Sequence, residues 1–205
     1  MSAGSGSYVN YLMPGILVIT VATGISYTSF RLFADMQAGI VGRLRSMPIA
    51  RSSVLWAHVL TSLVANLVSV VIVIAVALVM GFRSSAGIGS WLGAAGIMLL
   101  FTLTLTWIAI IPGLTARSSD GAVAFSYPLI FLPFVSSAFV PTATMPGPLR
   151  WFADHQPVTP LVDSLRSLLA GQPASADLWA GLAWCLGILI VAYVVATTIY
   201  RRRMS

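Results

Sequence analysis

Five long stretches of apolar residues alternate with short polar segments along the chain. An α-helix rises 1.5 Å per residue, so about 20 apolar residues are needed to cross the hydrocarbon core of a bilayer. Backbone groups within a bilayer must satisfy their own hydrogen bonds, which favours helices. The pattern therefore predicts an all-α fold, a polytopic transmembrane bundle of about five spans, at residues 11–30, 54–82, 90–114, 122–140 and 178–200.

The fourth stretch is shorter than the others and contains Pro128 and Pro133. A proline inside a helix removes a backbone hydrogen-bond donor, and its ring clashes with the preceding turn. We therefore expect residues 122–140 to form a kinked or broken helix rather than a straight one.

Charged residues are scarce and lie between the apolar stretches. They make up 8% of the 205 residues, and all eleven basic residues are arginines. Counting alternate segments places eight of them on one side, namely Arg31, Arg43, Arg45, Arg51, Arg117, Arg201, Arg202 and Arg203. Cytoplasmic segments carry the excess of basic residues, so we expect the N-terminus outside and the C-terminus inside. Arginine-only, alanine-rich usage is typical of a bacterial chain, and the predicted location is the bacterial cytoplasmic membrane.

The first predicted cytoplasmic loop, residues 31–53, has a helical period of its own. Apolar residues recur every three or four positions, at Phe33, Met36, Ile40, Leu44 and Met47. Asp35 and Arg45 fall on the opposite face, and Pro48 ends the pattern. Such a helix could rest on the lipid surface or dock a cytoplasmic partner, and periodicity alone favours neither.

On the opposite side, residues 141–177 form a segment that is too polar to span the membrane. It contains a second apolar stripe, at Leu161, Val162, Leu165, Leu168 and Leu169. We expect Thr159 to cap this short amphipathic helix and Gly171 to end it. The helix could close a pathway from outside or lie on the outer leaflet, and the pattern does not separate these alternatives.

Polar side chains inside the predicted spans include Asn66, Thr102, Thr104, Thr106, Ser126 and Ser136. In membrane proteins such residues most often hydrogen-bond to the backbone or between helices. They are also candidates for contacts with a substrate that crosses the bundle. The structural role is the commoner one.

Several classes of function are disfavoured by residues that the sequence lacks. Long uncharged stretches are unlike the basic, aromatic-rich faces of nucleic-acid-binding proteins. No acidic residue falls inside a predicted span, which disfavours an ion-coupled carrier. His58 and His155 fall on opposite sides of the predicted membrane, so we expect no metal site. The sequence has no lysine for a phosphate-binding loop, so ATP hydrolysis would need another polypeptide.

Four ordered motifs carry a family resemblance. Residues 8–15 read Tyr-Val-Asn-Tyr-Leu-Met-Pro-Gly, residues 43–48 read Arg-Leu-Arg-Ser-Met-Pro, and residues 139–146 read Phe-Val-Pro-Thr-Ala-Thr-Met-Pro. Residues 155–166 begin with His-Gln-Pro-Val-Thr-Pro and end with Asp-Ser-Leu-Arg. With these motifs the chain resembles the type-2 ABC exporter permeases of the daunorubicin/doxorubicin-resistance branch.

The resemblance implies that residues 1–205 are a single permease domain of an exporter that moves a hydrophobic or amphipathic drug, antibiotic or lipid outward. Two copies, or two related chains, would pair in the membrane. A separate cytoplasmic ATPase subunit would bind ATP and Mg, so this chain would carry no cofactor and no catalytic residue. Membrane lipid would be its other neighbour.

The resemblance also suggests which residues act. The coupling helix toward the ATPase would include Phe33, Asp35, Met36, Gly39, Ile40, Arg43, Leu44, Arg45, Met47 and Pro48. The candidate substrate pathway comprises Asn66, Thr102, Thr106, Ser126 and Ser136. The extracellular gate would include Thr159, Asp163 and Arg166.

The sequence differs from the family pattern at one point, since family members carry a further span ahead of the first motif. A permease shortened in this way could instead be a membrane anchor or assembly partner that transports nothing. A secondary multidrug carrier is the third alternative, and it is disfavoured by the missing acidic residues.

Overall fold

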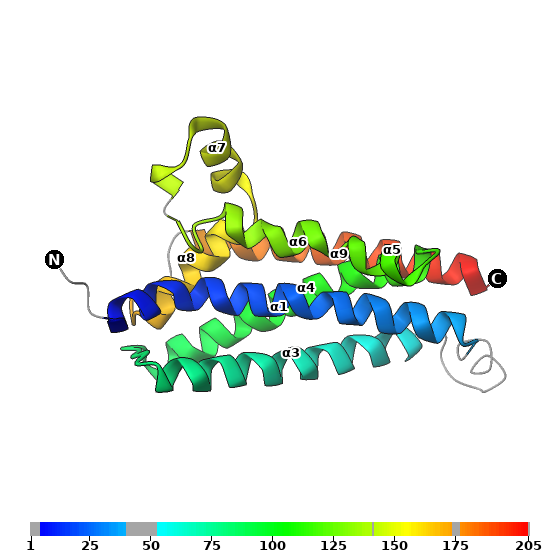
Figure 1. Cartoon of the computed structure of the whole chain (residues 1–205), viewed down its shortest axis with the longest axis horizontal. Coiled ribbons are helices and arrows are strands. Elements are labelled where there is room, and N and C mark those ends of the chain that lie inside the picture. Colours follow the sequence, from blue (N-terminus) through cyan, green and yellow to red (C-terminus); the bar gives the residue numbers. More distant parts are fainter. Residues whose placement is uncertain (1–4, 40–52, 141, 174–176, 205) are drawn as a thin grey trace.

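The computed structural model describes residues 5–39, 53–140, 142–173 and 177–204. Four long helices run side by side along the longest axis (Figure 1), namely α1 (Ser5–Gln37), α3 (Ser53–Val79), α4 (Ile88–Thr115) and α9 (Asp177–Met204). Each is long and apolar enough to cross a membrane. These helices match four of the five predicted spans, and the polytopic helical fold is confirmed.

Helix α4 is the centre of the bundle and packs against α1, α3, α8 and α9. In its most apolar stretch 61% of the residues are buried, compared with 22% for α3 and 17% for α9. The buried Trp107 of α4 meets Trp56 of α3 and Tyr193 of α9 edge to face, with ring centroids 5.5 and 4.8 Å apart. The outward faces of α3 and α9 remain apolar and uncovered, as expected for helices in contact with lipid.

The fourth predicted span is broken, as its prolines predict. It consists of two short helices and a 3₁₀ turn, α5 (Ser119–Ala124), α6 (Tyr127–Phe131) and η1 (Leu132–Val135). Pro128 and Pro133 lie in the first turns of α6 and η1, where a missing N–H costs least. The segment still runs along the bundle, opposite in direction to α4 (Figure 1). This broken pass joins the two ends of the molecule.

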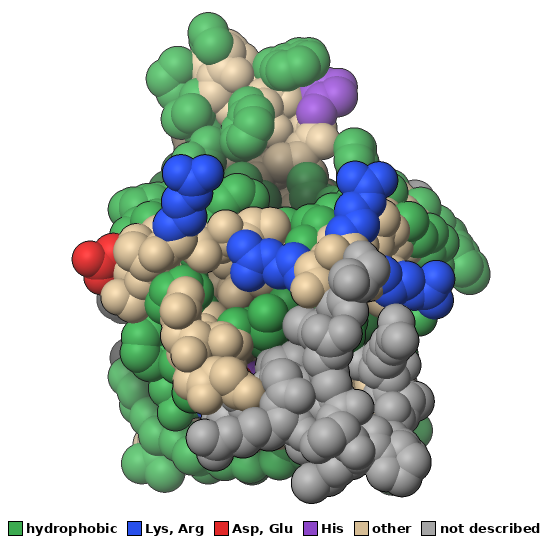
Figure 2. All heavy atoms as spheres, turned by 90° about the vertical axis from the view of Figure 1, so that its right-hand side faces the viewer, with side chains coloured by type: hydrophobic (Ala, Val, Ile, Leu, Met, Phe, Trp, Pro, Cys, Tyr) green, Lys and Arg blue, Asp and Glu red, His purple; other side chains and the backbone are tan. Residues whose placement is uncertain are grey.

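Arginine side chains gather at the end of the bundle where α1 and α9 finish, which Figure 2 shows face on. Arg31 lies near the end of α1, and Arg201, Arg202 and Arg203 form the last turn of α9. This inner end is the one that the arginine count assigns to the cytoplasm. The opposite, outer end carries Arg83, Arg150 and Arg166.

The predicted cytoplasmic loop, residues 31–53, begins later than its pattern indicates. Helix α1 continues without a break to Gln37, so Phe33 and Met36 belong to the spanning helix. Gly39 then adopts a φ of +68°, a conformation that glycine tolerates and that stops a helix. The prediction of one continuous helix across this loop is therefore wrong. The remaining predicted coupling residues lie outside the described residues, namely Ile40, Arg43, Leu44, Arg45, Met47 and Pro48.

The outer segment forms two helices and a short 3₁₀ turn instead of one helix, η2 (Thr142–Thr144), α7 (Gly147–His155) and α8 (Val158–Leu169). Helix α8 buries its predicted stripe against α1, α4 and α9, so it does not lie on the outer leaflet. Gly171 ends α8 with a φ of +71°, as predicted. The predicted cap is wrong, because the hydroxyl of Thr159 donates to the carbonyl of Ala153 over 2.6 Å.

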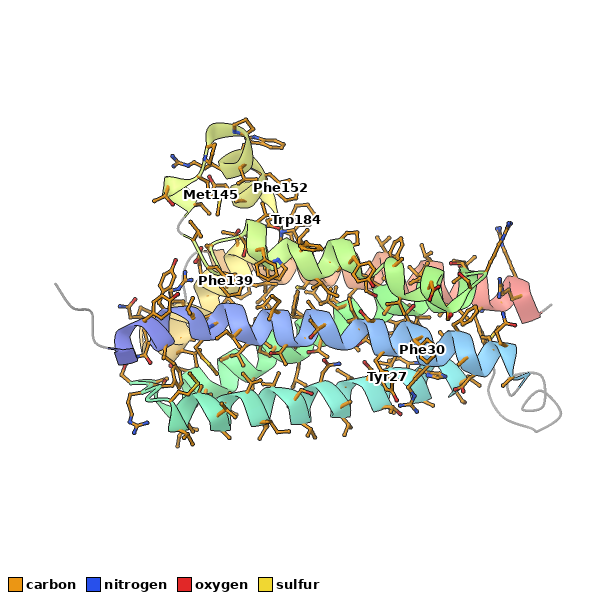
Figure 3. The ribbon with its side chains drawn as sticks, in the orientation of Figure 1. Tyr27, Phe30, Phe139, Met145, Phe152 and Trp184 are labelled. Atoms are coloured by element: carbon orange, nitrogen blue, oxygen red, sulfur yellow. The ribbon has the colours of Figure 1, made fainter. Side chains whose placement is uncertain are left out.

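Helix α7 projects sideways from the bundle near the outer end (Figure 1). Phe152 and Met145 lie on this projecting part (Figure 3), and the side chain of Trp151 is 65% exposed. Among the described residues, the main contacts of α7 are with the neighbouring elements α8, η1 and η2.

Candidate functional site

Three side chains meet at the outer end, between α8 and the turn that follows the broken pass. Arg166 donates from Nη1 to Asp163 Oδ1 over 2.6 Å and from Nη2 to the backbone carbonyl of Ser137 over 2.8 Å. The Ser137 hydroxyl donates to the same Asp163 oxygen over 2.8 Å. The planar guanidinium thus ties the carboxylate and the turn together, a geometry that a lysine could not reproduce.

Two further residues complete this group. The ring of Tyr11 on α1 lies 4.5 Å from the Arg166 guanidinium, close enough for a cation–π attraction. Gln156, between α7 and α8, donates from Nε2 to the carbonyl of Val135 over 2.6 Å. The outer cluster consists of Tyr11, Ser137, Gln156, Asp163 and Arg166. It connects α1, α8 and η1 with residues 136–140, which form the outer turn.

The outer turn reaches α1 because Gly15 has no side chain. A Cβ at Gly15 would lie 2.9 Å from the carbonyl oxygen of Ala138, which is fully buried. Figure 3 shows the neighbouring Phe139 between α1 and the projecting helices. The turn is therefore inserted between α1 and α8, and the outer cluster fixes it there.

Two atoms of the outer cluster are buried without a hydrogen-bond partner among the described residues, namely Gln156 Oε1 and Arg166 Nε. A buried polar atom without a partner costs about 1–3 kcal/mol. The hydrogen bonding of the outer cluster is therefore incomplete among the described residues.

The structure brings together two of the three predicted gate residues, Asp163 and Arg166. Thr159 is buried and bonded to α7, outside the cluster. Sequence reasoning missed Ser137, which gave no signal inside an apolar stretch. It also gave no role to Tyr11 and Gln156, although both belong to motifs that carry the family resemblance.

A second polar group lies in the inner half of the bundle, where α1, α3 and α4 meet. The hydroxyls of Thr28 and Ser62 are 2.7 Å apart, and those of Ser62 and Thr106 are 3.4 Å apart. Asn66 donates from Nδ2 to the carbonyl of Ser62 over 2.9 Å. Thr28, Ser62, Asn66 and Thr106 form the polar seam, all of them buried. It joins three spans by hydrogen bonds across and along the helices.

The five predicted pathway residues lie in four separate places. Asn66 and Thr106 belong to the polar seam. Thr102 donates to the carbonyl of Met98 over 2.7 Å and lines an apolar cavity. Ser126 lies at the break between α5 and α6, and Ser136 donates to the carbonyl of Pro133 in the outer turn. The structure does not gather them into one site, and their part in a pathway stays a prediction.

The inner ends of α1 and α3 are joined by a contact between a carboxyl group and a histidine. Asp35 Oδ2 lies 3.2 Å from His58 Nε2, and the two side chains are 39% and 11% exposed. Phe33 and Met36 are partly buried near the same end, and Gly39 is exposed. Helices α1 and α3 flank residues 40–52, so the pair connects the two sides of that loop.

The described residues hold no group of three His, Cys, Asp or Glu side chains that could bind a metal. His58 pairs with Asp35 at the inner end. His155 contacts the carbonyl of Trp151 over 2.8 Å and stacks on its ring near the outer end. The two histidines therefore lie at opposite ends of the bundle.

Comparisons with known proteins point to one family. Residues 2–170 match the family described as ABC-2 type transporter. The chain is 28% identical to the daunorubicin resistance ABC transporter permease protein DrrB1 of Streptomyces coeruleorubidus, over 96% of this chain and 70% of that protein. It is 24% identical to the probable doxorubicin resistance ABC transporter permease protein DrrC of Mycobacterium tuberculosis, over 93% and 69%.

A third relative is also named as a permease. The putative transport permease ycf38 of Porphyra purpurea is 28% identical over 78% of this chain and 55% of that protein. The family match covers α1 to α8, including every residue of the outer cluster. With its spanning helices, the chain belongs to the ABC-2 type transporter family and is a multi-pass membrane permease subunit of an ABC exporter.

Proposed function

We propose that this permease moves an apolar or amphipathic small molecule outward, with the outer cluster as its extracellular gate. The names of the Streptomyces and Mycobacterium relatives refer to daunorubicin and doxorubicin resistance, which supports amphipathic aromatic drugs as the substrate class. ATP and Mg would be bound by a separate cytoplasmic ATPase, since the sequence lacks a lysine for a phosphate-binding loop.

The observation that carries this proposal is a broken helix with one exposed side at membrane depth. The backbone of the broken pass departs from regular α-helix between α5 and α6 and again at η1. Aromatic side chains along it are about half exposed or more, namely Phe125, Tyr127, Phe131 and Phe134. Irregular backbone is tolerated within a bilayer only where protein covers it or where it lines a water-filled cavity. We expect this side to face a second permease copy or a related chain, with the pathway along their seam.

The outer cluster would keep this pathway closed in the described conformation. When α8 moves away from the outer turn, Arg166 and Ser137 exchange their mutual hydrogen bonds for bonds to water, which limits the net cost. Gln156 Oε1 and Arg166 Nε, which have no protein partner in the closed arrangement, would gain water. The free energy of opening is therefore smaller than the number of broken contacts suggests.

The ATPase would act on the inner end through residues 31–53. Helices α1 and α3 flank this loop and are joined by the Asp35–His58 pair and by the polar seam. A push on the loop would therefore move both helices together, and the polar seam would transmit it to α4. The predicted coupling residues, from Phe33 to Pro48, keep that function as part of the proposal.

Oxidative cross-linking in membranes tests the proposed contact between two chains along the broken pass. Phe131 is 63% exposed on the broken pass, and Val76 is 53% exposed on the lipid side of α3. In a Cys185→Ser background, Phe131→Cys should give a disulfide-linked pair of chains, whereas the matched Val76→Cys should stay monomeric. Equal cross-linking of both variants would contradict this contact between chains. So would a monomeric Phe131→Cys chain whose thiol reacts freely with a maleimide.

Co-purification in mild detergent tests the coupling to an ATPase. The intact chain should form a stable complex with the ATPase encoded nearest to it, and changing both Arg43 and Arg45 to Asp should abolish the complex. Cells that express the pair should accumulate less daunorubicin than cells with the variant. If the variant keeps both the complex and the efflux at equal expression, the coupling function of this loop is wrong.

A further inference from the structure

An apolar cavity lies inside the bundle, away from the broken pass and the outer cluster. It measures about 170 Å³ and is enclosed by α1, α3, α4 and the end of α8. Its wall includes Leu17, Val70, Ala94, Met98 and Leu169. Thr102 also lines the cavity, and its hydroxyl already donates to the carbonyl of Met98. The cavity therefore offers almost no polar contact to an occupant.

The cavity cannot collapse easily, because polar contacts fix the helices at both of its ends. On the inner side the polar seam joins α1, α3 and α4. On the outer side Asn10 of α1 exchanges two hydrogen bonds of 3.1 Å with the backbone of Arg83. Ser84 donates to the carbonyl of Leu169 over 2.6 Å. The helices are thus held together above and below a region that their side chains do not fill.

The open side of the cavity lies on the lipid-facing surface. Leu67, Val71 and Leu99 line it and are 50%, 57% and 47% exposed. In a spanning bundle the medium at this position is hydrocarbon, not water. An apolar cavity of about 150 Å³ stays dry and binds benzene-sized molecules, because unfilled walls lose dispersion contacts. Hydrocarbon from the bilayer is therefore the occupant that is both chemically suited and present.

We infer that this cavity is a binding site for the end of a lipid acyl chain, separate from the pathway that we propose along the broken pass. The chain end enters between Leu67 and Leu99 and fills the space beside Ala94 and Met98. An acyl chain in this position completes the packing of α4 against α1 and α3. It does not depend on the proposed gate or on the ATPase.

Photo-cross-linking in lipid nanodiscs tests the site. The probe is a phosphatidylcholine with a diazirine at the far end of one acyl chain, and labelled residues are mapped by mass spectrometry. The intact chain should be labelled at buried residues such as Met98. Ala94→Phe fills the cavity and should reduce that label about tenfold, equal to about 1.4 kcal/mol of binding. Ala75→Phe places the same ring on an exposed face of α3 outside the cavity and should leave the label unchanged.

A second pair of variants covers the case in which Ala94→Phe fails to fold. Leu67→Trp blocks the mouth without entering the core, whereas Val68→Trp adds the same ring at the neighbouring exposed position. Only Leu67→Trp should reduce the label inside the cavity. Labelling confined to lipid-facing residues of the intact chain would overturn the inference. Label at Met98 that persists in folded Ala94→Phe or Leu67→Trp protein would overturn it too.

Discussion

At the scale of single residues, Arg166 connects three segments of the molecule. Its side chain is 27% exposed, and it contacts a carboxylate, a backbone carbonyl and an aromatic ring from three different segments. Removing a charged side chain leaves its buried partners without their hydrogen bonds. The free-energy cost of these unsatisfied groups is larger than the net contribution of the hydrogen bonds. Arg150, which pairs with Asp154 at 3.6 Å on the exposed α7, offers the natural comparison.

Arg166→Ala should lower the free energy of unfolding by about 1–3 kcal/mol, because Asp163 and the carbonyl of Ser137 lose their donor. Arg150→Ala should change it by less than about 0.5 kcal/mol, since both partners of that pair are largely exposed. Thermal unfolding of both variants in the same detergent measures the difference. Equal losses would show that the outer cluster contributes no more than a surface ion pair.

Gly24 tests the polar seam. A Cβ at this position would lie 2.3 Å from Asn66 Oδ1, so Gly24→Ala should cost about 1–3 kcal/mol through overpacking. Asn66→Ala removes the obstructing amide, and the double variant should lose less stability than the two single losses added together. A Cβ at Gly96 on α4 would meet no atom within 4 Å, so Gly96→Ala should be neutral or stabilising. Strict additivity of Gly24→Ala and Asn66→Ala would contradict this packing.

At the scale of elements, the broken pass distinguishes this bundle from a set of straight spans. Pro128 and Pro133 divide it, and the outer turn that follows bends back against Gly15 of α1. The interruption presents Ser137 to α8, so the irregular segment and the outer cluster depend on each other. A straight fourth helix would carry the turn away from Asp163.

Replacing both prolines by alanine should therefore favour a continuous helix, since proline costs about 3 kcal/mol in a helix interior. The protein should still insert, but the outer turn should lose its contact with α8 and the efflux of daunorubicin should fall. Pro112→Ala provides the control, because α4 is already continuous at Pro112 near the inner end. Membrane level and drug accumulation are measured together. Undiminished efflux by the double variant would contradict a functional break.

Much of this architecture could be predicted from sequence, because span length and charge asymmetry follow directly from the bilayer. The positions of the long helices and the break at the two prolines are of this kind. The outer cluster could be predicted only in part, since Asp163 and Arg166 are charged but Ser137 lies in an apolar stretch. The predicted first span ends at residue 30, whereas helix α1 continues to Gln37. The apolar period continues past residue 30, and no strong polar signal in the sequence marks the turn at Gly39.

At the scale of the whole molecule, contacts concentrate around α4 while two surfaces stay open. The lipid-facing sides of α3 and α9 are regular helix and need no cover. The broken pass and α7 carry exposed aromatic side chains beside irregular backbone. We propose that these aromatic side chains face a second permease copy or a related chain, whereas α3 and α9 face lipid.

A reversible disulfide across the outer cluster tests the gate most directly. The Ser137 hydroxyl and the Asp163 carboxylate are 2.8 Å apart, so cysteines at both positions are within reach of each other. In a Cys185→Ser background, with the ATPase present, we expect oxidation to stop daunorubicin export and a reductant to restore it in the same sample. Each single-cysteine variant should be insensitive to oxidation. If protein with a fully formed disulfide exported daunorubicin as fast as the reduced protein, this result would contradict a gate at this position.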